Sequence, residues 1–131
     1  MKFEFLIRKR PLSLQAKRKS LQAWKSFVHT QAAIVWKDSV IETGDLQLTL
    51  VYLCDVSPPD IDNIVKPIQD ALIGLVFSDD SLIADVDSHR RSLNGIFDLT
   101  QLPSLVVDGI VSGNECVYVQ VSSSRQLEAY L

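Results

Sequence analysis

The sequence predicts an α/β (α+β) fold, in which a mixed β-sheet carries two main helices and the elements follow the order β-α-β-α-β-β. Apolar residues alternate with a period of two in four short segments, which is typical of strands. They recur at helical spacing in the two longer segments that separate the first three of these strands. The chain has 131 residues, so we expect a single domain over residues 1–131.

The first strand is expected at residues 2–8, where large apolar side chains alternate with polar ones. Pro11 ends this strand, because proline has no N–H to donate to a sheet. Apolar residues at helical spacing predict the first helix at residues 13–36, with Ser13 as its N-cap.

The second strand is expected at residues 46–54, and both of its faces are apolar. Such a strand is usually central in its sheet. The second helix is expected at residues 62–74, with Gly74 as a natural end. Pro67 removes one backbone donor from this helix, so we expect its first turn to be irregular.

The third strand is expected at residues 81–91. One of its faces is charged and carries Asp85, Asp87, His89 and Arg91. Residues 102–110 predict a short helix or turn, and residues 115–122 predict the last strand.

The composition points to an ordinary globular protein. No apolar run approaches the roughly 20 residues that span a bilayer, and the N-terminus lacks a signal-peptide pattern, so we expect a cytoplasmic protein without membrane contact. Cys54 and Cys116 lie in strand-like segments and have no CxxC partner. We expect both to be reduced, buried packing residues.

The charge is distributed unevenly along the chain. Residues 1–37 hold nine basic side chains and one acid, whereas the rest of the chain has a net charge of −11. Such asymmetry is typical of proteins that bind nucleic acid or membranes, although a solvated basic helix face is the simpler alternative. Five basic residues are candidates for contacts with DNA phosphates: Lys17, Arg18, Lys19, Arg90 and Arg91.

Two groups of carboxylates flank the second predicted helix. If residues 60–62 are extended, Asp60 and Asp62 point the same way, close to the helix N-terminus. Either aspartate alone could be an ordinary N-cap. Asp79 and Asp80 follow the helix, and they meet the first pair only if the next strand runs alongside it.

A cluster of such carboxylates would need a cation, because unpaired carboxylates repel one another and raise each other's pKa. Oxygen ligands without clustered Cys or His favour Mg²⁺, with Mn²⁺ as a substitute. Asp62, Lys66 and Asp70 lie in one row at helical spacing. Lys66 could therefore form surface ion pairs, or it could reach a bound phosphate.

Residues 60–85, DIDNIVKPIQDALIGLVFSDDSLIAD, resemble the signature of the RusA-like Holliday junction resolvases. That family shows D-x-D-N-x-x-K, then Asp-Ala-Leu within a helix, then a pair of aspartates. The resemblance implies a Mg²⁺-dependent endonuclease that acts as a homodimer on branched DNA. It implies that Asp60 and Asp62 are metal ligands, that Asp80 is the third catalytic carboxylate and that Lys66 assists at the scissile phosphate.

The resemblance implies acidic positions of less certain role for Asp79, Asp70 and Asp85, with Asp79 a further candidate metal ligand. His89 shares a strand face with Asp85 and is a further candidate for a role in a site. Three alternatives stay open: a broader nuclease for flaps or single strands, a DNA-binding module without cleavage, and an interaction protein whose aspartates are only caps and surface charges.

Overall fold

The computed structural model describes residues 1–131 and is built on a four-stranded sheet of order β1-β4-β2-β3. The strands are β1 (Lys2–Ile7), β2 (Leu46–Cys54), β3 (Ile83–Ser92) and β4 (Cys116–Ser123). β4 pairs antiparallel with both β1 and β2, and β2 pairs parallel with β3. The sheet is therefore mixed and β2 lies inside it, as the sequence predicted.

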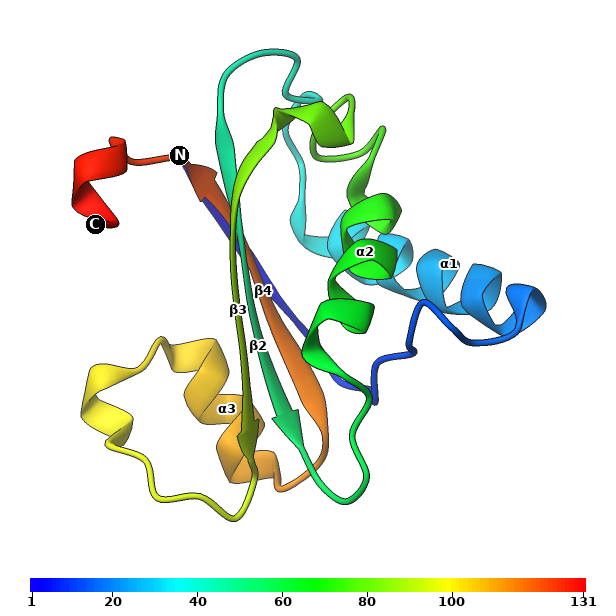
Figure 1. Ribbon diagram of the computed structural model, residues 1–131, viewed down its shortest axis with the longest axis vertical. Coiled ribbons are helices and arrows are strands. Elements are labelled where there is room, and N and C mark those ends of the chain that lie inside the picture. The colour runs from blue at the N-terminus through cyan, green and yellow to red at the C-terminus, as the bar shows by residue number, and fades with distance from the viewer.

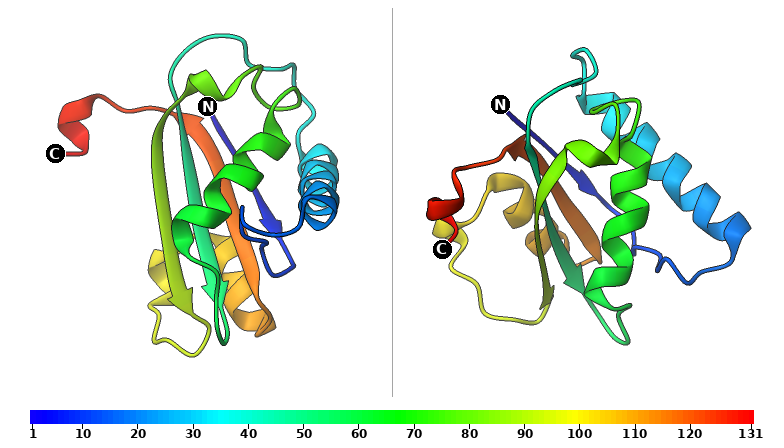
Figure 2. Two further views of the ribbon diagram at one scale, coloured as in Figure 1. Left: turned by 45° about the vertical axis from the view of Figure 1, so that its right-hand side comes forward. Right: turned by 45° about the horizontal axis from the view of Figure 1, so that its top comes forward.

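Three helices pack on this sheet: α1 (Arg18–Val35), α2 (Ile61–Leu72) and α3 (Ser104–Ser112). Three short 3-10 turns complete the fold: η1 (Asp80–Leu82) and η2 (Leu99–Gln101) lie between other elements, and η3 (Leu127–Ala129) follows β4. Figure 1 shows α1 and α2 on one face of the sheet and α3 on the other, and both views of Figure 2 agree. We call these the α2 face and the α3 face.

The main core lies under the α2 face. Alternate residues of β2, including Leu48, Leu50 and Tyr52, pack there against Ile64 and Ile68 of α2. All five are fully buried. Because the side-chain period of a strand is two, the intervening residues of β2 point to the α3 face.

The N-terminus of α1 differs from the prediction. The helix begins at Arg18 and not at Ser13, and its N-cap position is Lys17, which makes no capping hydrogen bond. Ser13 instead forms a separate turn, in which its Oγ accepts a hydrogen bond from the N–H of Gln15. A tertiary contact explains the difference, because the N–H of Leu14 donates to the carbonyl of Asn63 in α2 at 2.8 Å.

Pro67 accounts for that contact. In an α-helix the N–H of residue 67 would bond the carbonyl of residue 63, but proline has no N–H. The free carbonyl of Asn63 accepts from Leu14. The helix therefore continues through a buried Pro67, with its missing bond supplied by another segment, and it ends at Leu72, before Gly74.

The remaining elements follow the sequence closely. The predicted short helix or turn is α3, whose Gly109 lies against Cys116 of β4. Both cysteines are buried and free, as expected. No helix combines the length and hydrophobicity needed to cross a membrane.

Candidate active site

The aspartates of the D-x-D sequence lie at the start of α2. Asp60 occupies the N-cap position and Asp62 lies in the first turn. The assumption that residues 60–62 are extended is wrong, because α2 already begins at Ile61. Residues two apart in a helix do not share a face. Both carboxylates nevertheless lie beside the positive end of the α2 dipole, which stabilises negative charge.

Lys66 joins α2 to the aspartate pair that follows it. Its Nζ lies 2.9 Å from Asp70 Oδ1 and 3.0 Å from Asp80 Oδ2. The hydrogen bond to Asp70, followed by that to Asp80, raises the pKa of Lys66 above its ordinary value. Lys66 is therefore a fixed positive charge, one helical turn beyond Asp62.

Asp79 and Asp80 have different surroundings. The Asp79 carboxylate accepts from the N–H of Ser81 at 3.2 Å and so caps η1. Hydrogen bonds from Ser81 hold the pKa of Asp79 below its ordinary value. Asp80 turns instead toward Lys66, which makes it the member of the pair that faces α2.

The chemistry of this donor set suits a hard divalent cation. Asp60 and Asp62 are exposed, and neither carboxylate takes part in an ion pair or caps the helix with its side chain. Carboxylate oxygens are the ligands that Mg²⁺ and Mn²⁺ prefer. The side chains do not form a group of three His, Cys, Asp or Glu residues that could hold a metal ion. Asp80, from η1, contacts Lys66, which follows Asp62 by one turn of α2.

Strand β3 divides its charged residues between the two faces of the sheet. Arg90 lies opposite Tyr52 on the α2 face, and its Nη1 reaches the carbonyl of Pro59 at 3.5 Å. Arg91 lies opposite Leu53, lines a cavity of about 340 Å³ on the α3 face, and so points away from α2.

The other charged residues of β3 accompany Arg91. Asp85 and Asp87 both line a second cavity with Tyr130, and His89 Nε2 pairs with Asp87 Oδ1 at 2.8 Å. The structure therefore places Asp85 and His89 on the face opposite Lys66, apart from the other candidate residues.

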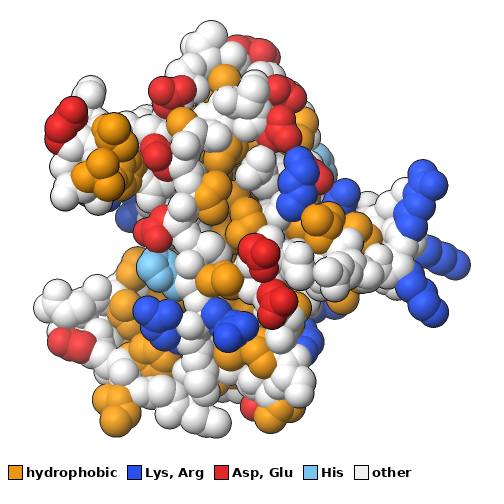
Figure 3. Space-filling view, in the orientation of Figure 1, with side chains coloured by type: hydrophobic (Ala, Val, Ile, Leu, Met, Phe, Trp, Pro, Cys, Tyr) orange, Lys and Arg blue, Asp and Glu red, His pale blue; other side chains and the backbone are white.

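A basic surface lies at the exposed start of α1. Lys17, Arg18 and Lys19 are exposed, and no ion pair in the structure includes any of them. Figure 3 shows basic side chains where α1 protrudes and acidic side chains over the start of α2. Positive and negative surfaces therefore lie on the same side of the molecule.

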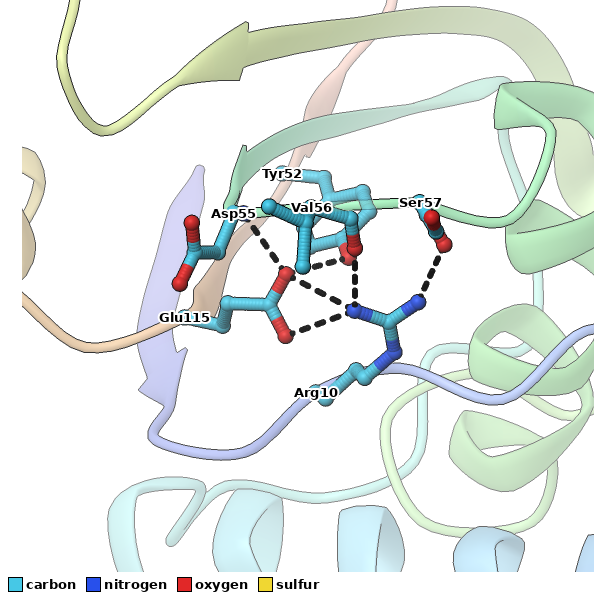
Figure 4. A network of polar contacts seen from close by, with 6 residues as sticks. All are labelled: Arg10, Tyr52, Asp55, Val56, Ser57 and Glu115. Carbon is cyan, nitrogen blue, oxygen red and sulfur yellow. Dashed lines mark hydrogen bonds and ion pairs between the residues drawn. The ribbon is translucent and has the colours of Figure 1, made fainter.

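Sequence reasoning missed one polar network beside the start of α2. Arg10, from the segment after β1, pairs with Glu115 at 3.1 Å. Figure 4 shows that the two side chains meet at the loop that leads into α2. Arg10 carried no sequence signal beyond its charge, and Glu115 precedes a strand far along the chain, so only the tertiary fold brings them together.

Comparison with protein families gives a match that covers most of the chain. The family model described as endodeoxyribonuclease RusA matches residues 8–96 of the 131 residues. The match covers the D-x-D sequence, Lys66, Asp80 and Arg90, and it ends before α3. A search of curated proteins found no match.

Proposed function

The chain belongs to the endodeoxyribonuclease RusA family, and we propose that it is a Mg²⁺-dependent, structure-specific endodeoxyribonuclease that resolves four-way DNA junctions by paired cuts. The observation that carries the proposal is the contact of Lys66 with Asp80 at 3.0 Å, one helical turn from Asp62. This contact joins the two ends of the family signature in space, although the residues are 14 positions apart.

Asp60, Asp62 and Asp80 would hold the cation, with Asp79 as a further candidate. Mg²⁺ bound there would supply an activated water and neutralise charge on the phosphate, and Mn²⁺ would substitute for it. The position of Asp60 and Asp62 at the N-terminus of α2 lowers the cost of bringing two carboxylates together before any ion is bound.

Lys66 would stabilise the negative charge that develops on the phosphate during cleavage. Asp70 is suited to a positioning role, because its Oδ1 lies 2.9 Å from the Lys66 ammonium and both residues belong to α2. If Asp80 turned to a cation, Lys66 would keep this second partner and stay near the site.

DNA would approach from the α2 face. The start of α1, which carries Lys17, Arg18 and Lys19, lies on this side of the sheet, and Arg90 points to the same face; these residues would contact phosphates. The affinity would then fall steeply as salt increases, because each neutralised phosphate releases counterions. Carboxylates at the cleavage site would repel DNA, so the attraction that holds the DNA would come from this separate basic surface.

We place the homodimer contact at β3. This strand forms an edge of the sheet, with β2 as its only neighbour. If a two-fold axis perpendicular to the sheet passed beside Ser88, Asp85 would face Arg91 of the second copy and Asp87 would face His89. Each aspartate of β3 on the α3 face would then face an Arg or His side chain of the second copy, and both α2 helices would lie on the same face of a continuous sheet.

The decisive experiment compares cleavage of a four-way junction, a flap and a linear duplex with Mg²⁺ and with EDTA. We expect symmetric paired nicks on the junction, only with Mg²⁺, and loss of cleavage in Asp62→Asn. Asp108→Asn is the matched control, since Asp108 is exposed on α3 on the opposite face. Equal cutting of all three substrates would support a broader nuclease, and binding without any cutting would support a DNA-binding module. A cytoplasmic place of action is part of the same proposal.

A further inference from the structure

The loop at residues 55–59 connects β2 to α2 and ends directly before Asp60. It belongs to no helix or strand, and two of its residues, Pro58 and Pro59, have no backbone N–H. Ser57 has a φ of 50°, in the left-handed region that is unfavourable for residues other than glycine. The loop therefore has few internal interactions to fix its shape.

Arg10 supplies donors to this loop from a distant segment. Its guanidinium donates to the carbonyl of Val56 at 3.1 Å and to the carbonyl of Ser57. The same group binds both carboxylate oxygens of Glu115 at 3.1 Å. The planar guanidinium thus holds the strained residue and its neighbour at once, as Figure 4 shows.

Glu115 fixes the opposite end of the loop. Its Oε1 accepts from the N–H of Asp55 at 2.7 Å and from the hydroxyl of Tyr52 at 3.0 Å. Burial alone would raise the pKa of the Glu115 carboxyl, but hydrogen bonds from Asp55, Tyr52 and Arg10 outweigh it and lower that pKa. The hydrogen bond to Glu115 also raises the pKa of Arg10. Both partners are therefore charged at neutral pH.

We propose that Arg10 and Glu115 are positioning residues, which fix the 55–59 loop and thereby the place of Asp60 and Asp62 at the candidate cation site. The inference rests on the proposed function. Neither residue hydrogen-bonds the candidate ligands: Arg10 donates to loop carbonyls and Glu115 accepts from the Asp55 amide. Their effect passes through the backbone, since Asp60 is the residue next to Pro59.

The test uses the full chain and the variants Glu115→Gln and Arg10→Lys. Gln keeps the shape of Glu115 but loses its charge, and Lys keeps the charge of Arg10 but cannot span both carbonyls and the carboxylate. Calorimetric titration with Mn²⁺ in the absence of DNA should show about tenfold weaker binding in each variant. Hydrogen exchange should become faster at the amides of residues 55–57 and 60–62 and stay unchanged in α3.

Cleavage of the junction gives the second measurement. Each variant should need about tenfold more Mn²⁺ for half-maximal cleavage and should approach the wild-type rate at saturating Mn²⁺. A purely structural defect would instead lower the rate at every concentration. Arg8→Ala is the matched control, because Arg8 belongs to the same segment but makes no hydrogen bond or ion pair with the loop, and it should keep wild-type Mn²⁺ affinity.

Three results would overturn the inference: unchanged Mn²⁺ affinity in both variants, unchanged exchange of residues 55–57 and 60–62, or equal effects in Arg8→Ala. A wild-type protein that binds Mn²⁺ but cuts no DNA would count against the proposed function alone. The titration would then still decide the inference. Thermal denaturation of each variant checks that the fold is kept, and Tyr52→Phe, which removes only one bond to Glu115, provides a milder second variant.

Discussion

Lys66 Nζ donates a hydrogen bond to Asp80 Oδ2 across 3.0 Å and so joins α2 to η1. The ammonium would otherwise extend freely into solvent from an exposed helix position. Because Asp70 binds the same ammonium, its location is fixed from two sides. A positive charge held in this way needs little reorganisation to stabilise a developing anion.

Lys66→Gln should reduce the single-turnover cleavage rate about 10²- to 10³-fold at saturating DNA and Mg²⁺, because the amide carries no charge. The raised pKa of Lys66 keeps it charged, so the wild-type rate should show no loss from its deprotonation below about pH 10. Lys37→Gln is the control, since the Lys37 ammonium donates only to the carbonyl of Ala33. A near wild-type rate in Lys66→Gln would remove Lys66 from the mechanism.

Charge reversal at β3 tests the proposed dimer. Asp85→Arg should weaken self-association by placing two positive charges opposite each other in the two copies, and Arg91→Asp should do the same with two negative charges. The double variant should restore the dimer, because the complementary pairs are re-formed. Sedimentation at several protein concentrations measures this, with Asp108→Arg as the control. A double variant that stays monomeric, or single variants that stay dimeric, would exclude this edge.

The two arginines of β3 should differ in DNA binding. Arg90 points to the α2 face beside Pro59, so Arg90→Ala should weaken junction binding about tenfold. Arg91 lines a cavity on the α3 face, so Arg91→Ala should have a smaller effect at protein concentrations where the oligomeric state is unchanged. Fluorescence anisotropy with Ca²⁺ in place of Mg²⁺ measures affinity without cleavage. Equal losses would mean that DNA contacts both faces.

Gly109→Ala should destabilise the fold by about 1–3 kcal/mol. A Cβ at this position would lie 2.7 Å from Cys116 Sγ and 3.3 Å from Leu53 Cδ1. The sign of this change in the free energy of unfolding is informative, because the same substitution at an open helix position would stabilise the protein by up to about 1 kcal/mol. Urea denaturation of the single variants and of Gly109→Ala with Cys116→Ala forms a thermodynamic cycle. Additive effects would show that Cys116 is not the obstacle.

Alkaline pH should destabilise the protein through Tyr118. Burial, followed by the hydrogen bond to Glu4, raises the pKa of Tyr118 to about 12, compared with about 10 in an unfolded chain. The phenol therefore contributes its full stability below about pH 10 and loses it as the pH rises toward 12. Urea denaturation at about pH 9 and pH 11 should show a smaller loss in Tyr118→Phe than in wild type. Identical losses would contradict the assignment.

The order of the elements and the central position of β2 could be predicted from the sequence, because apolar periodicity records burial directly. The start of α1 could not, since Leu14 is held by Asn63, which lies in a different helix. The candidate ligands were visible as a motif, but their geometry was not. Only the fold shows that Asp80 meets Lys66, that Asp79 caps η1 and that Asp85 belongs to the opposite face.

The same reasoning explains why Arg10 and Glu115 escaped notice. They are far apart in sequence and belong to no short motif, and Glu115 lies outside the residues matched by the family model. Their relation depends on β1 and β4 being neighbours in the sheet, which hydrophobic patterning does not specify. Local sequence patterns thus predict which residues are buried, whereas polar pairs between distant segments can be identified only once the topology of the sheet is known.

The proline within α2 has a consequence for protein engineering. Because Pro67 leaves the Asn63 carbonyl to the N–H of Leu14, α2 is incomplete without the segment that precedes α1. A graft of the D-x-D-N-x-x-K helix onto another scaffold would therefore carry an unsatisfied acceptor in the turn that bears its aspartates. The unit that can be transferred is therefore α2 together with the segment before α1 that contains Leu14, and the two must be moved together.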